Sequence, residues 1–90
     1  MKGDKTMPEI ARFYGIVIKM YFKQADHNPP HFHAISGDCM GAFDIQTGKM
    51  IEGDLPKRAI KMVQEWATKY RSELMTIWET QKFIELPPLI

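Results

Sequence analysis

The amino-acid sequence predicts a single α+β domain in which a small antiparallel sheet is followed by a C-terminal helical segment. Between residues 10 and 52, short runs of β-branched and aromatic residues alternate with Gly, Pro and polar turn residues, which is typical of antiparallel strands. From residue 55 onward the apolar residues recur at helical spacing instead. We therefore expect three to four strands, with one bent helix or two helices packed on one face of the sheet.

The composition is that of one globular domain. Ninety residues are too few for two domains, and 44% hydrophobic with 26% charged residues argues against a disordered chain. We expect the domain over residues 7–82, after a disordered leader at 1–6 and before a C-terminal tail at 83–90. The net charge of +1 argues against attraction of the whole molecule to nucleic acid or to a membrane.

Cysteine usage and hydropathy indicate a cytoplasmic protein. The single cysteine, Cys39, cannot close an internal disulfide, which fits a reducing compartment. The sequence has neither an apolar run of about eighteen residues nor the pattern of a signal peptide. Secretion and membrane spanning are therefore not expected.

The predicted strands follow one another with short connections. Strands are expected at residues 16–22, 31–35, 40–45 and 49–52, and the core face of the first comprises Ile16, Ile18 and Met20. Strand formers already begin at Ile10, and Gly15 is expected to mark a bulge or bend between a short first piece and the longer strand at 16–22. Because turns as short as these join neighbouring antiparallel strands, we expect a meander.

Helical periodicity begins after Gly53. Asp54, Leu55 and Pro56 form an acidic helix start, in which proline is tolerated because it lies in the first turn. The apolar stripe comprises Ala59, Ile60, Val63, Trp66, Ala67, Tyr70, Leu74, Ile77 and Trp78, and both tryptophans are expected in the core. No Gly or Pro interrupts the stripe, so one bent helix and two helices both remain open. Ser72 is a candidate cap that favours a break near Arg71.

All three histidines lie in one segment, Asp26-His27-Asn28-Pro29-Pro30-His31-Phe32-His33. Its two consecutive prolines remove two backbone donors and fix φ, so the segment enters the following strand as a stiff connection. Alternate side chains of a strand share a face, so His31 and His33 are expected to point the same way. Asp26 and His27 could fold back over them.

Three interpretations of this histidine segment remain open. The metal-binding hypothesis uses zinc or another divalent transition ion and the ligands His27, His31, His33 and Asp26. In a metal-independent ribonuclease, His31 and His33 would instead act as general acid and base, and Arg12 or Lys19 would stabilise the developing charge. In the third interpretation these side chains only brace the turn of a non-catalytic interaction module.

Two charged groups lie outside that segment. Glu9 and Arg12 precede the long strand, and a structural ion pair is a better prediction for them than catalysis. A basic cluster opens the helix and consists of Lys57, Arg58 and Lys61. It is a candidate for nucleic-acid phosphate contact, although a solvated face balanced by Asp54 and Glu65 is the commoner explanation.

The chain resembles a widespread small bacterial family of unknown function. The similarity covers Pro8 to Trp78 and rests on a PEIxRFYGIxIKM segment, the DHNPPHFH motif, Asp44-Ile45, Gly53, Leu55-Pro56-Lys57-Arg58, Trp66, Leu74 and Trp78. Members resemble components of toxin–antitoxin-like gene pairs, since they are short and commonly encoded beside another small uncharacterised protein. The resemblance implies a cytoplasmic bacterial protein that acts with a small partner protein through protein or RNA contacts. A homo-oligomer also remains open.

Overall fold

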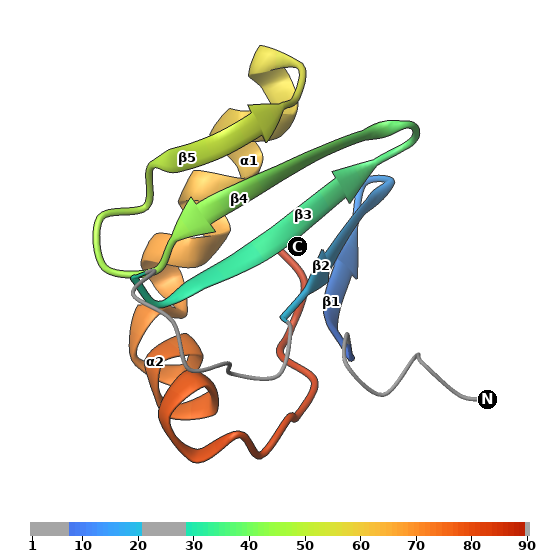
Figure 1. Ribbon diagram of the computed structural model, residues 1–90. Coiled ribbons are helices and arrows are strands. Elements are labelled where there is room, and N and C mark those ends of the chain that lie inside the picture. Colours follow the sequence, from blue (N-terminus) through green and yellow to red (C-terminus); the bar gives the residue numbers. More distant parts are fainter. Residues whose placement is uncertain (1–7, 21–28, 90) are drawn as a thin grey trace, which may run out of the picture.

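The structure is a computed structural model that describes residues 8–20 and 29–89. Over these residues, five antiparallel strands form one sheet in the order β1-β2-β3-β4-β5, and two helices follow (Figure 1). The elements are β1 Glu9–Phe13, β2 Ile16–Lys19, β3 His31–Ser36, β4 Cys39–Asp44, β5 Met50–Asp54, α1 Lys57–Lys69 and α2 Arg71–Thr80. The α+β class expected from the sequence is confirmed.

Within the described residues the sheet already has five strands, so the predicted number of three to four is wrong. The additional strand comes from the turn at Tyr14 and Gly15, whose φ angles are 49° and 77°. Two positive φ values at the centre of a two-residue turn belong to type I′, which matches the twist of a hairpin. The chain therefore folds back at Gly15 as β1 and β2, and it does not pass through a bulge.

The helical segment consists of two helices that meet at Tyr70. The Tyr70 N–H donates to the carbonyl of Trp66 over 3.1 Å and so ends α1, while its carbonyl accepts from the Leu74 N–H over 2.9 Å and starts α2. The prediction that Ser72 caps α2 is wrong, because Tyr70 is the N-cap residue and no side chain caps the helix. Asp54 belongs to β5, and Pro56 is the N-cap residue of α1.

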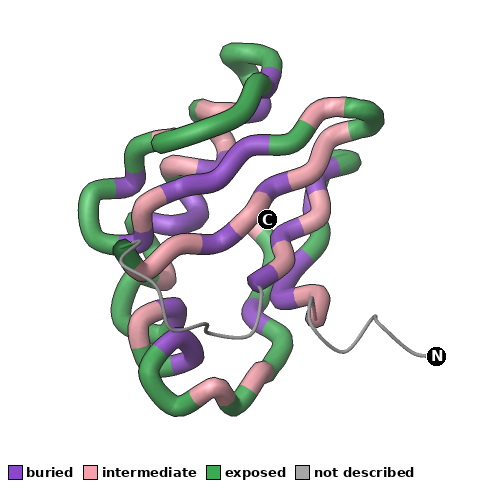
Figure 2. Tube along the Cα trace, in the orientation of Figure 1, coloured by how far each residue is buried: buried purple, intermediate pink, exposed green. Residues whose placement is uncertain are grey.

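α1 packs on one face of the sheet, and α2 lies beside the end of the sheet at which β3 begins, so the core lies between the sheet and the two helices (Figures 1 and 2). The expected core face of β2 is confirmed, since Ile16, Ile18 and Met20 are buried. Trp66 occupies the centre of this core. Its ring lies 5.7 Å from Phe13, 5.9 Å from Phe32 and 5.7 Å from Tyr70, and Phe32 also stacks on Phe43 at 5.5 Å. Trp78 is buried as well.

The C-terminal segment returns from α2 to β1. The chain turns at Gln81, which has φ 60°. The Leu86 N–H then donates to the carbonyl of Ile10, and Nε1 of Trp66 donates to the carbonyl of Pro87, each over 2.8 Å. The tail expected from the sequence is therefore attached to β1 and α1. The leader at residues 1–6 lies outside the described residues.

Candidate functional site

The face of the sheet opposite α1, called the outer face below, carries the two described histidines, and His31 lies at its edge, where β3 begins beside α2. Along β3, Phe32 and Ala34 are buried beneath the helices, whereas His31, His33 and Ile35 alternate with them and are partly exposed (Figure 2). The two imidazoles share a face, as the alternation along a strand predicts.

Strand register arranges the outer face in two neighbouring rows. The histidine row runs across the five strands as Glu9, Lys19, His33, Ala42 and Glu52. The aliphatic row runs as Arg12, Val17, Ile35, Met40 and Asp54. A register shift between Glu9 and Ala11 allows Glu9 and Arg12, three residues apart, to lie on the same face.

Glu9 and Arg12 form the ion pair that the sequence predicts. Nε of Arg12 donates to Oε2 of Glu9 over 3.0 Å, and a terminal guanidinium nitrogen donates to Oε1 over 2.9 Å. These hydrogen bonds lower the pKa of Glu9 and raise the pKa of Arg12. Arg12 is therefore engaged by Glu9 and lies two strands from His33, whereas Lys19 is the direct neighbour of His33 on β2.

His31 is held by the stiff segment that precedes it. Its Nδ1 lies 2.8 Å from the carbonyl oxygen of Pro29. Because a carbonyl only accepts, Nδ1 carries the proton, and Nε2 is the ring atom that can accept a hydrogen bond or bind a cation. The ring lies 5.3 Å from Trp78 of α2 and 5.3 Å from His33. Backbone and tryptophan together fix its orientation.

His33 is half-buried, and its Nδ1 atom is shielded from solvent. Burial lowers the pKa of His33, and the neighbouring His31 lowers it further, while the negative charge of Glu52 opposes both effects. Since this pKa falls below the ordinary value of 6.5, the imidazole is neutral at pH 7.

A small pocket of about 190 Å³ lies beside His33 on the outer face. It is lined by His33, Met40, Gly41, Ala42, Glu52 and Gly53. Gly53 has φ 105°, and a Cβ atom there would lie 2.3 Å from the carbonyl oxygen of Met40. Only glycine allows β5 to approach β4 so closely. Ala42, which is buried, lies between His33 and Glu52 in the histidine row and so beneath the pocket. Sequence reasoning missed Glu52 and Met40, because their position beside His33 depends on strand register.

Residues 15–79 match a protein family described as Domain of unknown function (DUF4160). The chain belongs to this family. The match includes His31 and His33, whereas Glu9 and Arg12 precede it. No curated protein and no solved structure matches the chain.

The structure brings together two of the four predicted metal ligands of this DUF4160 protein, His31 and His33. The other two, Asp26 and His27, lie outside the described residues. Among residues 8–20 and 29–89, no group of three or more His, Cys, Asp or Glu side chains could hold a metal ion. In the predicted metal site, Asp26 or His27 would add to the pair on β3.

The predicted basic cluster is not part of the histidine site. Lys57, Arg58 and Lys61 are exposed at the start of α1, in the layer behind the sheet. No helix in the described part of the DUF4160 protein is both long and apolar enough to cross a membrane.

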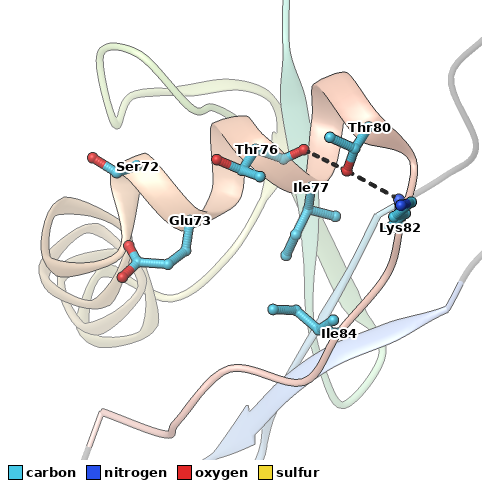
Figure 3. Close-up of a pocket in the computed structure, with 7 residues that line it drawn as sticks. All are labelled: Ser72, Glu73, Thr76, Ile77, Thr80, Lys82 and Ile84. Atoms are coloured by element: carbon cyan, nitrogen blue, oxygen red, sulfur yellow. Dashed lines mark hydrogen bonds between the residues drawn. The ribbon is translucent and has the colours of Figure 1, made fainter.

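A second hollow, of about 430 Å³, lies between α2 and the C-terminal segment (Figure 3). It is lined by Ser72, Glu73, Thr76, Ile77, Thr80, Lys82 and Ile84. The Thr80 hydroxyl donates to the carbonyl of Thr76 over 2.8 Å and accepts from the Lys82 N–H over 3.2 Å. Ile77 and Ile84 face each other across the hollow (Figure 3), which therefore offers mainly apolar contact.

Proposed function

We propose that this DUF4160 protein binds a small partner protein through the outer face of its sheet, as one member of a toxin–antitoxin-like pair. The observation that carries the proposal is the aliphatic row. Val17, Ile35 and Met40 lie side by side on three neighbouring strands, and Met40 is 45% exposed. Arg12 and Asp54 lie at the two ends of the row. An apolar centre with a charged rim is the usual anatomy of a protein interface.

The pattern of these residues differs from that of a solvated sheet face. An antiparallel sheet with helices on one side normally alternates apolar and polar residues, so that its free face is polar. Val17 and Ile35 point outward but are apolar, like the buried residues Ile18 and Ala34 that precede or follow them on the same strands. The outward-facing Val17 and Ile35 are only partly buried and lie on the face opposite α1, so a partner surface is the simplest reason for their apolar chemistry.

The charges of the outer face favour a protein partner over RNA. Binding of an RNA backbone requires clustered lysines or arginines that neutralise phosphates. Here Arg12 is paired with Glu9, and Lys19 acts electrostatically on the same carboxylate. Glu52 and Asp54 add two exposed negative charges on β5. The described part of this face therefore has no excess of positive charge.

Co-purification tests the proposal. The tagged protein is co-expressed with the small protein encoded beside it, and the recovered complex is quantified for the wild type and for Met40→Glu and Ile35→Glu. Both variants should lower the affinity at least tenfold, because each places a charge in the apolar centre. Gln46→Glu, in an exposed turn, is the matched control and should bind as the wild type does. Unchanged binding of Met40→Glu, with its circular dichroism intact, would refute the proposed interface.

Metal binding is a second candidate function. The imidazoles of His31 and His33 lie on one face with their centroids 5.3 Å apart. The Nδ1–H of His31 is donated to a backbone carbonyl, which is the usual support of a histidine that binds metal through Nε2. Zinc or a similar divalent ion, with Asp26 or His27 as further ligands, would use this pair.

Ribonuclease chemistry has less support from the structure. A neutral His33 beside His31 is compatible with a general base. However, Arg12 is bound by Glu9 and lies away from the imidazoles, so Lys19 would have to stabilise a phosphorane alone.

A further inference from the structure

The pocket beside His33 has the size of a site for one side chain. Its volume of about 190 Å³ lies below the range of about 300–1,000 Å³ that is typical of small-molecule pockets. It also lies within the outer face, where Met40 belongs both to the pocket and to the aliphatic row. A partner protein seated on that row would therefore cover the pocket.

The pocket walls differ in chemistry. Glu52 contributes an exposed carboxylate, and its negative charge acts on the His33 ring across the pocket. Met40 contributes an apolar wall, and the buried Ala42 lies beneath the pocket. Within residues 8–20 and 29–89, Glu52 takes part in no ion pair, whereas Arg12 is paired with Glu9. The pocket thus combines apolar lining residues with one negative charge.

We propose that this pocket receives an arginine or lysine side chain of the partner protein, with its cation against Glu52 and its aliphatic stem along Met40 and Ala42. Long basic side chains bury their stem in apolar surface and keep the charged end at a polar group. Arginine suits the site better than lysine, because its planar fork can donate two parallel hydrogen bonds to the Glu52 carboxylate. This inference rests on the proposed function and specifies the partner residue that the outer face selects.

Charge neutralisation at matched positions tests the inference. Glu52→Gln and Asp38→Asn each remove one negative charge, but Asp38 lies in the exposed β3–β4 turn and outside the pocket. In the complex with the neighbouring gene product, Glu52→Gln should weaken binding about tenfold, and Asp38→Asn less than about twofold. Equal effects of the two variants would overturn the inference, because they would show that only overall charge matters.

A second measurement separates failure of the inference from failure of the proposed function. The isolated protein is titrated with N-acetyl-arginine amide or with the uncharged N-acetyl-norleucine amide, and backbone amide NMR signals are followed. Only the arginine compound should shift the signals of Ala42, Glu52 and Gly53, and the shifts should be lost in Glu52→Gln. If these shifts appear although no partner binds, the pocket assignment holds and the proposed interface fails. If Met40→Glu abolishes the complex while Glu52→Gln changes neither measurement, the interface holds and the inference fails.

Sedimentation of the isolated protein tests whether a second copy of the chain, and not a partner protein, fills the pocket. The exposed basic cluster at Lys57, Arg58 and Lys61 could serve the same pocket in a second copy of the chain. A wild-type dimer that becomes monomeric in Glu52→Gln would overturn the assignment to a partner protein. A wild-type monomer supports it.

Discussion

The ring of His31 lies 5.3 Å from the ring of His33 at an interplanar angle of 73°. Both lie on the same side of β3 because they are two residues apart, but His31 lies at the end of the strand beside α2, so their surroundings differ. His31 is tied to the Pro29 carbonyl and packs against Trp78, whereas His33 is half-buried beside Glu52 and the small pocket. One short strand therefore presents a restrained imidazole and a neutral, partly desolvated one.

Stability should depend on pH through His33. Burial and His31 lower its folded-state pKa below 6.5, so the unfolded chain binds a proton more readily as the pH falls. The free energy of unfolding should therefore be insensitive to this group above about pH 7.5, decrease as the pH falls through 6.5, and level off below the folded-state pKa. Urea unfolding between pH 5 and 8 measures this dependence, and His33→Gln should flatten it. The same slope in wild type and variant would contradict the assignment.

Glu52 provides an internal check on that prediction. Lys19, His31 and Glu52 are the charged or titratable groups of β2, β3 and β5 that surround His33. Because the charge of Glu52 raises the pKa of His33, Glu52→Gln should lower it further. Proton NMR of the His33 ring reports the change directly, and an increase would show that the electrostatic interpretation is wrong.

Gly53 should be the glycine least tolerant of substitution in the β4–β5 region. Gly53→Ala brings a Cβ atom within 2.3 Å of the Met40 carbonyl oxygen at φ 105°, whereas Gly48→Ala is strained by φ 79° alone and meets no atom within 4 Å. We expect Gly48→Ala to lower the free energy of unfolding by about 1 kcal/mol and Gly53→Ala by about 2–4 kcal/mol. Urea denaturation measures both. Equal losses would mean that the close approach of the two strands does not contribute.

Zinc should stabilise the protein if the histidine pair binds metal. At a free zinc concentration of about a hundred times Kd, binding adds about 2.7 kcal/mol to the free energy of unfolding and raises Tm. Thermal unfolding with and without zinc, together with metal analysis of the purified protein, measures this effect. The double variant His31→Gln, His33→Gln should lose the shift, and Cys39→Ser should keep it. A metal-free protein whose Tm ignores zinc, nickel and manganese would exclude the hypothesis.

Local sequence pattern predicted the parts of the structure that depend on local geometry. The two-residue period of β3 placed His31 and His33 on one face, and the helical stripe placed Trp66 and Trp78 in the core. The predicted ion pair of Glu9 and Arg12 is confirmed as well. Each of these features depends on residues only a few positions apart, and at that distance the periodicity of the sequence predicts which residues share a face.

Features that depend on long-range pairing could not be predicted in this way. Glu52 lies beside His33 because β3 pairs His33 with Ala42 of β4, and β4 pairs Ala42 with Glu52 of β5. The second pairing also includes a register shift between Ala42 and Phe43, which local sequence does not reveal. The hairpin at Tyr14 was missed for a different reason. A tyrosine with φ 49° is uncommon, so the pair Tyr14-Gly15 does not carry the Asn-Gly signal of a type I′ turn.

Leu86 should hold the C-terminal segment in the core. It is 9% exposed, and its N–H donates to the Ile10 carbonyl, whereas Ile84 in the same segment is 56% exposed. Leu86→Ala leaves the backbone hydrogen bond in place but removes buried methyl groups, so it should lower the free energy of unfolding by about 2–3 kcal/mol. Ile84→Ala is the matched control and should change it by less than about 0.5 kcal/mol. Urea unfolding monitored by tryptophan fluorescence measures both, because Trp66 donates to the adjacent Pro87 carbonyl. If both variants lower the free energy of unfolding by a similar small amount, the residues after α2 add little to the core. Trp66 would then be held by its contacts with the strands alone.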